Sequence, residues 1–261
     1  SSVCIGRDNL TSTKSIRKSI VIGANASYTA TAVEDSVSIG SYAGTTVRGM
    51  ISSVAIGKSA LQCATAYSTS ATDCVAIGSN TMLASLSDIL NSTALGHGAN
   101  VTGNNQVQLG NSSTTVYAYG AVQNRSDARD KTNITDIEYP YKEFILGLRP
   151  VTFQWDYRED YRTNPDTPNT RSLGEITHDG TNIRNRRHNG FIAQEVKALM
   201  DSLGFDFAGY QDHSVNDGED VLTLGYTEFI PPMVKMIQYL YHENQELKTR
   251  LQKFEDTFAN V

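Results

Sequence analysis

The chain has 261 residues and a formal net charge of −6, and 39% of its residues are hydrophobic and 19% charged. This balance is typical neither of a disordered chain nor of a membrane protein, and the acidic net charge argues against nucleic acid as a main partner. No apolar run reaches the roughly 18 residues of a transmembrane helix, and the N-terminus lacks the pattern of a signal peptide. Because the chain begins without Met and inside a repeat, we expect it to be a fragment of a longer protein.

The cysteines and histidines predict neither a metal site nor a cofactor. Three cysteines are an odd number at irregular spacing, and the five histidines are scattered. We interpret Cys4, Cys63 and Cys74 as free thiols, with a disulfide between Cys63 and Cys74 as the alternative. The histidines (His97, His178, His188, His213 and His242) are interpreted as structural or solvated.

Ser126 separates two halves of different composition. Residues 1–126 hold 7 basic and 5 acidic residues and no proline, whereas residues 127–261 hold 15 basic and 23 acidic residues and all six prolines. A change of this size at one point indicates a domain boundary. We therefore predict a boundary between two domains, residues 1–125 and residues 126–261.

The first half repeats a Ser-x-x-Ile-Gly motif. The regular copies, with glycines 17 residues apart, are Ser2–Gly6, Ser19–Gly23, Ser36–Gly40 and Ser53–Gly57, and looser copies end at Gly78, Gly96 and Gly110. Apolar residues alternate with small ones inside each copy, which predicts a strand with one buried face. Such a repeat predicts an all-β solenoid of stacked coils.

The longer segments between the copies, such as 61–72 and 80–91, are expected to be loops or short helical excursions. Segments 24–34, 61–72 and 80–91 are candidates for receptor contact because projecting loops often carry binding surfaces. The Val54-Ala55-Ile56-Gly57 and Val75-Ala76-Ile77-Gly78 motifs resemble the head of the trimeric autotransporter adhesins, although the period of 17 is longer than in that family. The resemblance, over residues 1–110, implies a trimeric β-roll; a monomeric β-solenoid is the alternative.

The second half predicts an α+β domain. The expected elements, in chain order, are a helix over 135–148 that starts or restarts at Tyr141, a strand over 148–155, a long exposed excursion over 158–187, a strand from Gly190 that passes into a helix ending at Met200, and a strand over 221–224. Pro140 supports the start at Tyr141, and Pro165 and Pro168 indicate the excursion.

A long C-terminal helix is predicted over about residues 229–258. Its apolar residues alternate spacings of three and four, which is a coiled-coil seam. The seam consists of Ile230, Met233, Ile237, Leu240, Asn244, Leu247, Leu251, Phe254 and Phe258. The seam leaves two, three or four strands open, and the neighbouring β-roll favours three. The alternative is one amphipathic helix packed on its own domain.

Ser126 and Lys131 are the candidate catalytic pair. A serine and a lysine can act as nucleophile and base without histidine, provided that burial favours the neutral amine. Attack of Ser126 on the Arg125 carbonyl through a five-membered ring would cut between Arg125 and Ser126. Cleavage between Ser126 and Asp127 would need a strained four-membered ring or a neighbouring chain's serine, so the cleavage site is assigned to Arg125, Ser126 and Asp127, with the side open.

Four motifs occur in order in the second half. They are Ser126-Asp127-x-Arg129-x-Lys131-x-Asn133-Ile134, Leu148-Arg149-Pro150-Val151-Thr152-Phe153-x-Trp155, Gly190-Phe191-Ile192-Ala193-Gln194-Glu195-Val196, and Tyr226-Thr227-Glu228-Phe229-Ile230-Pro231. Residues 124–261 thereby resemble the C-terminal intramolecular chaperone of phage tailspikes and fibres, the peptidase S74 family. The resemblance implies that this domain trimerises a fibre and then releases itself by autoproteolysis, with the dyad on Ser126 and Lys131.

The resemblance also implies partners and a location. We expect a homotrimer in the virion tail, folded and cleaved in the host cytoplasm, that adheres to a host receptor (a glycan or an outer-membrane component) and joins upstream fibre or tail proteins. No cofactor, metal, nucleic acid or membrane insertion is expected. One alternative is a bacterial trimeric surface adhesin with an uncleaved oligomerisation module, and another is a glycan-depolymerising spike whose catalytic domain lies upstream.

Overall fold

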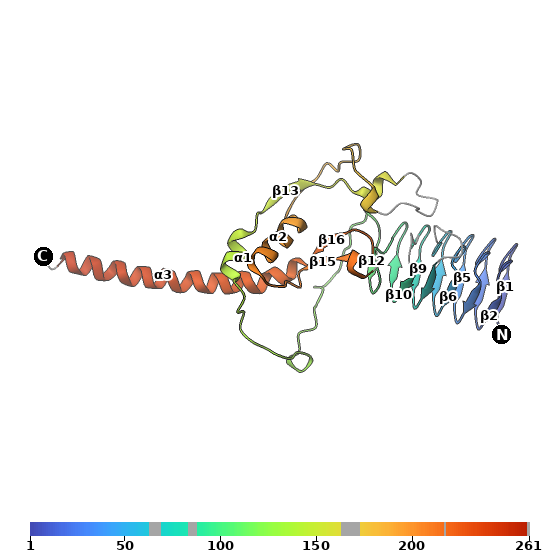
Figure 1. The fold of residues 1–261 in the computed structure, drawn as a ribbon, viewed down its shortest axis with the longest axis horizontal. Coiled ribbons are helices and arrows are strands. Elements are labelled where there is room, and N and C mark those ends of the chain that lie inside the picture. The colour runs from blue at the N-terminus through green and yellow to red at the C-terminus, as the bar shows by residue number, and fades with distance from the viewer. Residues whose placement is uncertain (63–68, 83–87, 163–172, 217, 260–261) are drawn as a thin grey trace. The chain divides into compact units, whose positions relative to one another are not determined.

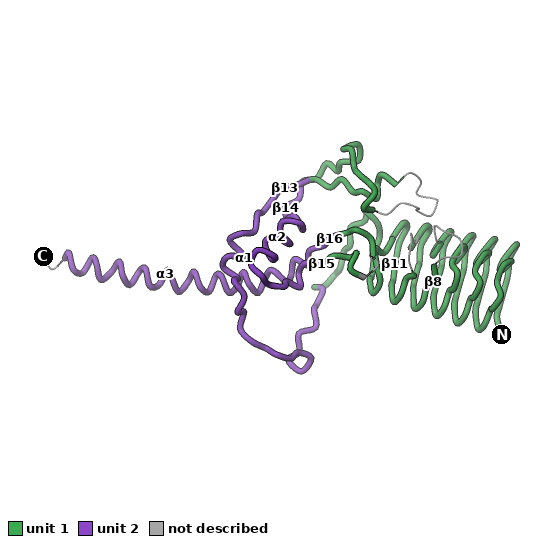
Figure 2. The backbone as a smooth tube through the Cα atoms, in the orientation of Figure 1, with its two compact units in different colours: residues 1–121, 154–186, 212–221 green, residues 122–153, 187–211, 222–261 purple. Residues whose placement is uncertain are grey.

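The computed structural model covers residues 1–261 and describes all of them except 63–68, 83–87, 163–172, 217 and 260–261. The chain forms two compact units, shown in Figure 2. Unit 1 contains residues 1–121, 154–186 and 212–221, and unit 2 contains the remainder. Two segments of the C-terminal half therefore belong to the unit that holds the repeats. The predicted division at Ser126 lies close to Val122, where unit 2 begins, and stays a prediction.

Residues 3–109 form a β-solenoid of two parallel sheets (Figure 1). Sheet A contains β1 (Val3–Ile5), β3 (Ile20–Ile22), β5 (Val37–Ile39), β7 (Val54–Ile56), β9 (Val75–Ile77), β11 (Thr93–Leu95) and β12 (Val107–Leu109). Sheet B contains β2 (Ser15–Arg17), β4 (Ala32–Glu34), β6 (Gly49–Ile51), β8 (Ser70–Thr72) and β10 (Ile89–Leu90). The predicted solenoid is confirmed.

The sequence motif accounts for sheet A alone, and sheet B was not predicted. Three of its five strands lie in segments that the sequence analysis treated as loops or short helical excursions. β4 lies in segment 24–34, β8 in segment 61–72 and β10 in segment 80–91, whose residues 63–68 and 83–87 are outside the described part. In β2, β4 and β8, small or polar residues lie on either side of one inward side chain. Only β6 and β10 add an outward aliphatic residue, Ile51 and Leu90, so sheet B carries no regular apolar signal.

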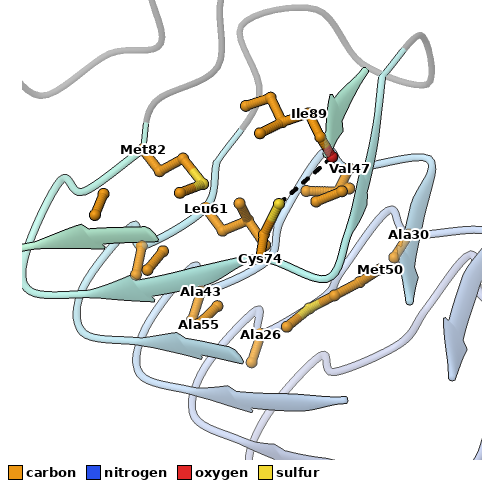
Figure 3. Close-up of a cluster of buried hydrophobic side chains, with 14 of the residues drawn as sticks. Ala26, Ala30, Ala43, Val47, Met50, Ala55, Leu61, Cys74, Met82 and Ile89 are labelled. Atoms are coloured by element: carbon orange, nitrogen blue, oxygen red, sulfur yellow. Dashed lines mark hydrogen bonds between the residues drawn. The ribbon is translucent and has the colours of Figure 1, made fainter. Parts of the chain in front are cut away.

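A narrow core of small side chains fills the solenoid (Figure 3). The middle residue of each inner strand points inward, as Val21, Ala55 and Ala76 do in sheet A and Val33 and Met50 do in sheet B. Most of the other buried residues are alanines. Small side chains let the two sheets approach closely, and Met50, Leu61 and Met82 are the largest fully buried side chains of this core.

A ladder of side-chain hydrogen bonds links successive coils at one corner. Its members, the serine ladder, are Ser19, Ser36, Ser53, Cys74 and Ser92. Ser53 Oγ donates to the Ile51 carbonyl at 2.7 Å and accepts the Cys74 amide at 3.1 Å. The ladder pairs buried backbone groups that the turn would otherwise leave unsatisfied.

The described parts of 154–186 and 212–221 contain three short 3-10 helices, η2 (Arg158–Tyr161), η3 (Leu173–Glu175) and η4 (His213–Asn216). The excursion predicted as exposed over 158–187 is buried in part, because Leu173 and Ile176 belong to the buried residues. Arg162 and Glu219, both nearly buried, form an ion pair of 3.2 Å that joins the two segments. Residues 163–172 lie outside the described part of the chain.

The same two segments contact the last coil of the solenoid. The Glu219 amide donates to the Thr102 carbonyl at 2.6 Å, and His213 Nδ1 lies 2.5 Å from Thr102 Oγ1. Ser112 Oγ donates to Asp160 at 2.8 Å. Polar contacts from the C-terminal half therefore cap the turns on either side of the last strand of the solenoid.

Unit 2 is α+β, as the sequence predicted. Its elements are η1 (Ala128–Asp130), α1 (Tyr141–Gly147), β13 (Val151–Gln154), β14 (Arg187–Gly190), α2 (Ala193–Leu203), β15 (Tyr210–Asp212), β16 (Leu222–Leu224), η5 (Tyr226–Phe229) and α3 (Ile230–Ala259), with β13 paired to β14 and β15 paired to β16. The helix expected over 135–148 begins only at Tyr141, because a proline disfavours helical backbone in the residue before it.

An aromatic cluster forms the core of unit 2. The fully buried ring of Phe144 lies 5.1 Å from Phe205 and 5.0 Å from Phe207, and Phe207 lies 4.8 Å from Phe229. Tyr139 stacks on Phe205 at 4.5 Å. These contacts join α1, the segment after α2 and the start of α3 into one core.

Helix α3 packs on unit 2 through one side of its first turns and leaves the predicted seam exposed. Pro232 and Met236 are buried, whereas Ile237 and Leu240 are more than half exposed, and every described residue after Leu240 is exposed. The helix therefore does not bury its seam on its own domain. Among the described residues, no helix combines the length and the apolar content needed to cross a membrane.

Candidate functional site

A 3-10 turn brings Ser126 and Lys131 together. Asp127 accepts the Arg129 amide at 2.9 Å and so begins η1, and the Lys131 amide donates to the Ala128 carbonyl at 3.2 Å at the end of that turn. The chain reverses over these residues, and Lys131 Nζ donates a hydrogen bond to Ser126 Oγ at 2.8 Å. The pair predicted from spacing is thus in contact, and its catalytic role stays a prediction.

Ion pairs order the same loop. Arg129 pairs with Asp127 at 2.5 Å, and Arg125 pairs with Asp130 at 2.7 Å. The hydrogen bonds from the Arg129 side chain and amide hold the pKa of Asp127 below its usual value, and Asp127 in turn raises the pKa of Arg129. These two ion pairs neutralise the charged neighbours of Ser126 and Lys131.

The whole loop is open to solvent in the single chain. Every residue from 125 to 131 is exposed. A serine hydroxyl needs a base to become a good nucleophile, and a lysine serves as that base only when its amine is neutral. Burial favours the neutral amine. In the single chain, this loop is not buried.

A second polar contact connects two of the sequence motifs. Arg149 Nε donates to Glu195 at 3.0 Å, with a further contact between Arg149 Nη2 and Glu195 Oε1. Hydrogen bonds from Arg149 hold the pKa of the Glu195 carboxyl below its usual value. Arg149 and Glu195 also line a small pocket, together with Leu148, Phe191 and Leu199.

The motif that begins at Tyr226 contacts the motif that begins at Gly190. The Phe191 amide donates to the Tyr226 hydroxyl at 3.1 Å, and Phe191 stacks near Phe229 at 5.3 Å. The motifs that begin at Leu148, Gly190 and Tyr226 therefore meet in space and hold the domain together. Sequence reasoning singled out these residues but gave no partner to Arg149, because its partner lies 46 residues along the chain.

Metal binding has no candidate among the described residues. No group of three or more His, Cys, Asp or Glu side chains there is placed to hold an ion. Cys4 is exposed and Cys74 is buried, and both are free thiols. Cys63, the other end of the alternative disulfide, lies outside the described residues.

The fold and the loop define a class of protein: a parallel β-solenoid followed by a small α+β domain that ends in a long, largely exposed helix. Residues 126–205 match the Peptidase_S74 family model, described as the chaperone of endosialidase. The match begins at Ser126 and supports, in general terms, a chaperone role for the C-terminal part of a fibre or tailspike. A search of curated proteins found no match to the chain.

Proposed function

We propose that the C-terminal half trimerises and folds the solenoid fibre and then separates from it by self-cleavage at Ser126. One observation carries the proposal. The family match begins at Ser126, the residue whose Oγ lies 2.8 Å from Lys131 Nζ, close to the start of unit 2. A chance pair of exposed residues would have no reason to lie at the junction of two parts with different folds.

The chemistry needs only groups in this loop and one water molecule. Lys131, once neutral, takes the proton of the Ser126 hydroxyl, and Oγ attacks the carbonyl carbon of Arg125. The five-membered intermediate collapses with cleavage of the Arg125–Ser126 C–N bond, and the nitrogen of Ser126 takes up the proton. Water then hydrolyses the resulting ester, which frees the Arg125 carboxylate and restores the serine hydroxyl.

In this proposal, Ser126 and Lys131 become able to react only when several chains assemble. Residues 125–131 are exposed in one chain, so a base with a neutral amine requires cover from elsewhere. Further copies held together through α3 would supply that cover at high effective concentration. Cleavage would then occur only after the chains have assembled, and the loss of the chaperone would make unfolding of the fibre slow.

The fibre half is proposed to adhere to a host receptor in the virion tail and to join upstream tail proteins. Two findings support this proposal: the solenoid is a continuous stack of parallel strands, and residues 126–205 match the family model of the chaperone of endosialidase. The adhesin alternative differs in one respect that is simple to measure, because its oligomerisation module would stay uncleaved.

Self-cleavage is tested on a denaturing gel of the full chain. We expect wild type to give two fragments of about half of 28.5 kDa each, while Ser126→Ala stays intact. Lys131→Ala should also stay intact, and the control Ser113→Ala should cleave as wild type does. The N-terminal residue of the C-terminal fragment, Ser126 or Asp127, identifies the bond.

Two outcomes would overturn parts of the proposal. If wild type stays intact after it has folded and assembled, the autoproteolysis is wrong and the adhesin alternative gains. If Lys131→Ala cleaves at the wild-type rate, lysine is not the base.

A further inference from the structure

Two side-chain contacts lie on either side of the peptide bond between Arg125 and Ser126. Arg125 Nε lies 2.7 Å from Asp130 Oδ2 in an ion pair, and Lys131 Nζ donates to Ser126 Oγ at 2.8 Å. Two consecutive residues at the end of the η1 turn, 130 and 131, therefore hold the two consecutive residues 125 and 126. The bond proposed to be cut lies between these two contacts.

The other two charged side chains of the loop pair with each other. Arg129 Nε donates to both carboxylate oxygens of Asp127, each at 3.1 Å, and this pair stays within the turn. It leaves the Asp130 carboxylate available for Arg125. Within the loop 125–131, all of which the structure describes, the pair of Arg125 and Asp130 is the one that connects the residue before Ser126 to the turn.

The proposed reaction depends on where the Arg125 carbonyl lies. Ser126 Oγ must meet the Arg125 carbonyl carbon to close the five-membered ring, and the alignment of reacting atoms is worth large factors in rate. Lys131 fixes the position of Oγ. Residues 113–124, which precede Arg125, are all exposed in the single chain, so packing does not fix the position of its carbonyl.

We propose that Asp130 is a positioning residue for the self-cleavage: its carboxylate holds the Arg125 side chain on the turn and so keeps the Arg125 carbonyl beside Ser126 Oγ. The inference rests on the proposed function and deepens it. Asp130 does not touch the reacting atoms and acts through Arg125. The pair is exposed in the single chain and contributes little there. Cover by assembled copies would remove water and strengthen it.

Cleavage rates of the full chain test this role, with fragment formation timed on a denaturing gel after cell-free synthesis. We expect Asp130→Asn and Arg125→Gln each to slow cleavage roughly tenfold, because the carbonyl is no longer held in place. Their native mass, followed by light scattering, should equal that of wild type. Asp136→Asn is the matched control, since it removes another exposed carboxylate of unit 2 and should cleave at the wild-type rate.

Reversal of the charges separates positioning from a general structural need for aspartate. Arg125→Asp/Asp130→Arg restores an ion pair across the same bond with its partners exchanged. We expect this double variant to cleave several-fold faster than Arg125→Asp or Asp130→Arg alone. A double variant no faster than the two single variants overturns the inference.

Hydroxylamine, which cleaves esters, assigns the step at which Asp130 acts. Positioning of the Arg125 carbonyl precedes formation of the ester, so added hydroxylamine should leave Asp130→Asn as slow as before. Recovery of the wild-type rate would place the effect of Asp130 in ester hydrolysis and overturn the inference.

The outcomes separate this inference from the proposed function. If wild type cleaves and Asp130→Asn cleaves at the same rate, the positioning role is wrong and the reaction of Ser126 with Lys131 stands. If wild type assembles and never cleaves, the self-cleavage itself is wrong, and the role of Asp130 is lost with it.

Discussion

The glycine that ends each inner strand of sheet A has a backbone conformation that excludes side chains. Gly40 has a φ of +131°, and a Cβ atom there would lie 2.5 Å from the Gly57 carbonyl oxygen. The next coil occupies the space that any other residue would need. The Ile-Gly step of the repeat is therefore a condition for stacking the coils rather than a mark of flexibility.

We predict that Gly40→Ala lowers the free energy of unfolding by on the order of 3 kcal/mol or more, because both the positive φ and the clash oppose a side chain. Chemical denaturation of the full chain measures the change. Gly120→Ala is the control, since no atom lies within 4 Å of its added Cβ. A loss at Gly40 no larger than the loss at Gly120 would contradict the explanation.

Single substitutions in the serine ladder give a second prediction. Ser53→Ala leaves the buried Cys74 amide without its acceptor, so we expect a loss of about 1–3 kcal/mol. Cys74→Ser should be neutral or stabilising, because a serine occupies the equivalent corner in the other coils and a hydroxyl makes stronger hydrogen bonds than a thiol. Thermal unfolding of both variants measures this, and a large loss in Cys74→Ser would show that the ladder needs the size of sulfur.

At the scale of elements, the segments 154–186 and 212–221 behave as a cap on the last coil. His213 Nδ1 lies 3.2 Å from the Gln106 amide nitrogen, and because that nitrogen can only donate, an unprotonated Nδ1 suits this contact. Burial lowers the pKa of His213 from its ordinary value of 6.5, against the opposing charge of Asp212. The neutral ring is thus the form that the cap accommodates.

The sign of the pH effect follows from this lowered pKa. The contribution of His213 is fully present above the unfolded pKa of 6.5 and is lost as the pH falls through the lower folded value. We expect amide protection factors over 101–112 to fall in wild type as the pH drops from 7.5 to 5, and to fall less in His213→Asn, which keeps a polar side chain without a proton to gain. An equal fall in both would assign the effect to other groups.

For the whole molecule, the exposed seam of α3 couples assembly to cleavage in our proposal. We predict that Leu247→Lys converts the chain to a monomer and suppresses cleavage, because a lysine on the seam would be buried between copies. Gln245→Lys adds the same charge away from the seam and should leave both properties unchanged. Light scattering and a denaturing gel measure the two effects. A Leu247→Lys monomer that still cleaves at the wild-type rate would show that cleavage at Ser126 does not depend on assembly.

The sequence determined by itself those features whose signal lies within a few residues. The Val-x-Ile-Gly pattern predicted sheet A, because alternation and a turn glycine are local properties. The heptad spacing predicted α3, which begins at Ile230 beside Pro231 and Pro232. The contact between Ser126 and Lys131 was also predictable, since a single 3-10 turn with its N-cap residue spans the four residues between them.

Only the tertiary structure decided the features that depend on distant partners. Sheet B forms because each of its strands pairs with a strand of the next coil and faces the core, although its strands share no repeated sequence motif. His213 contacts Thr102, and Arg149 pairs with Glu195. These partners lie far apart in the sequence, and no periodic pattern relates them. A local pattern fixes the direction of neighbouring side chains, whereas the contacts between remote segments follow from how the whole chain packs.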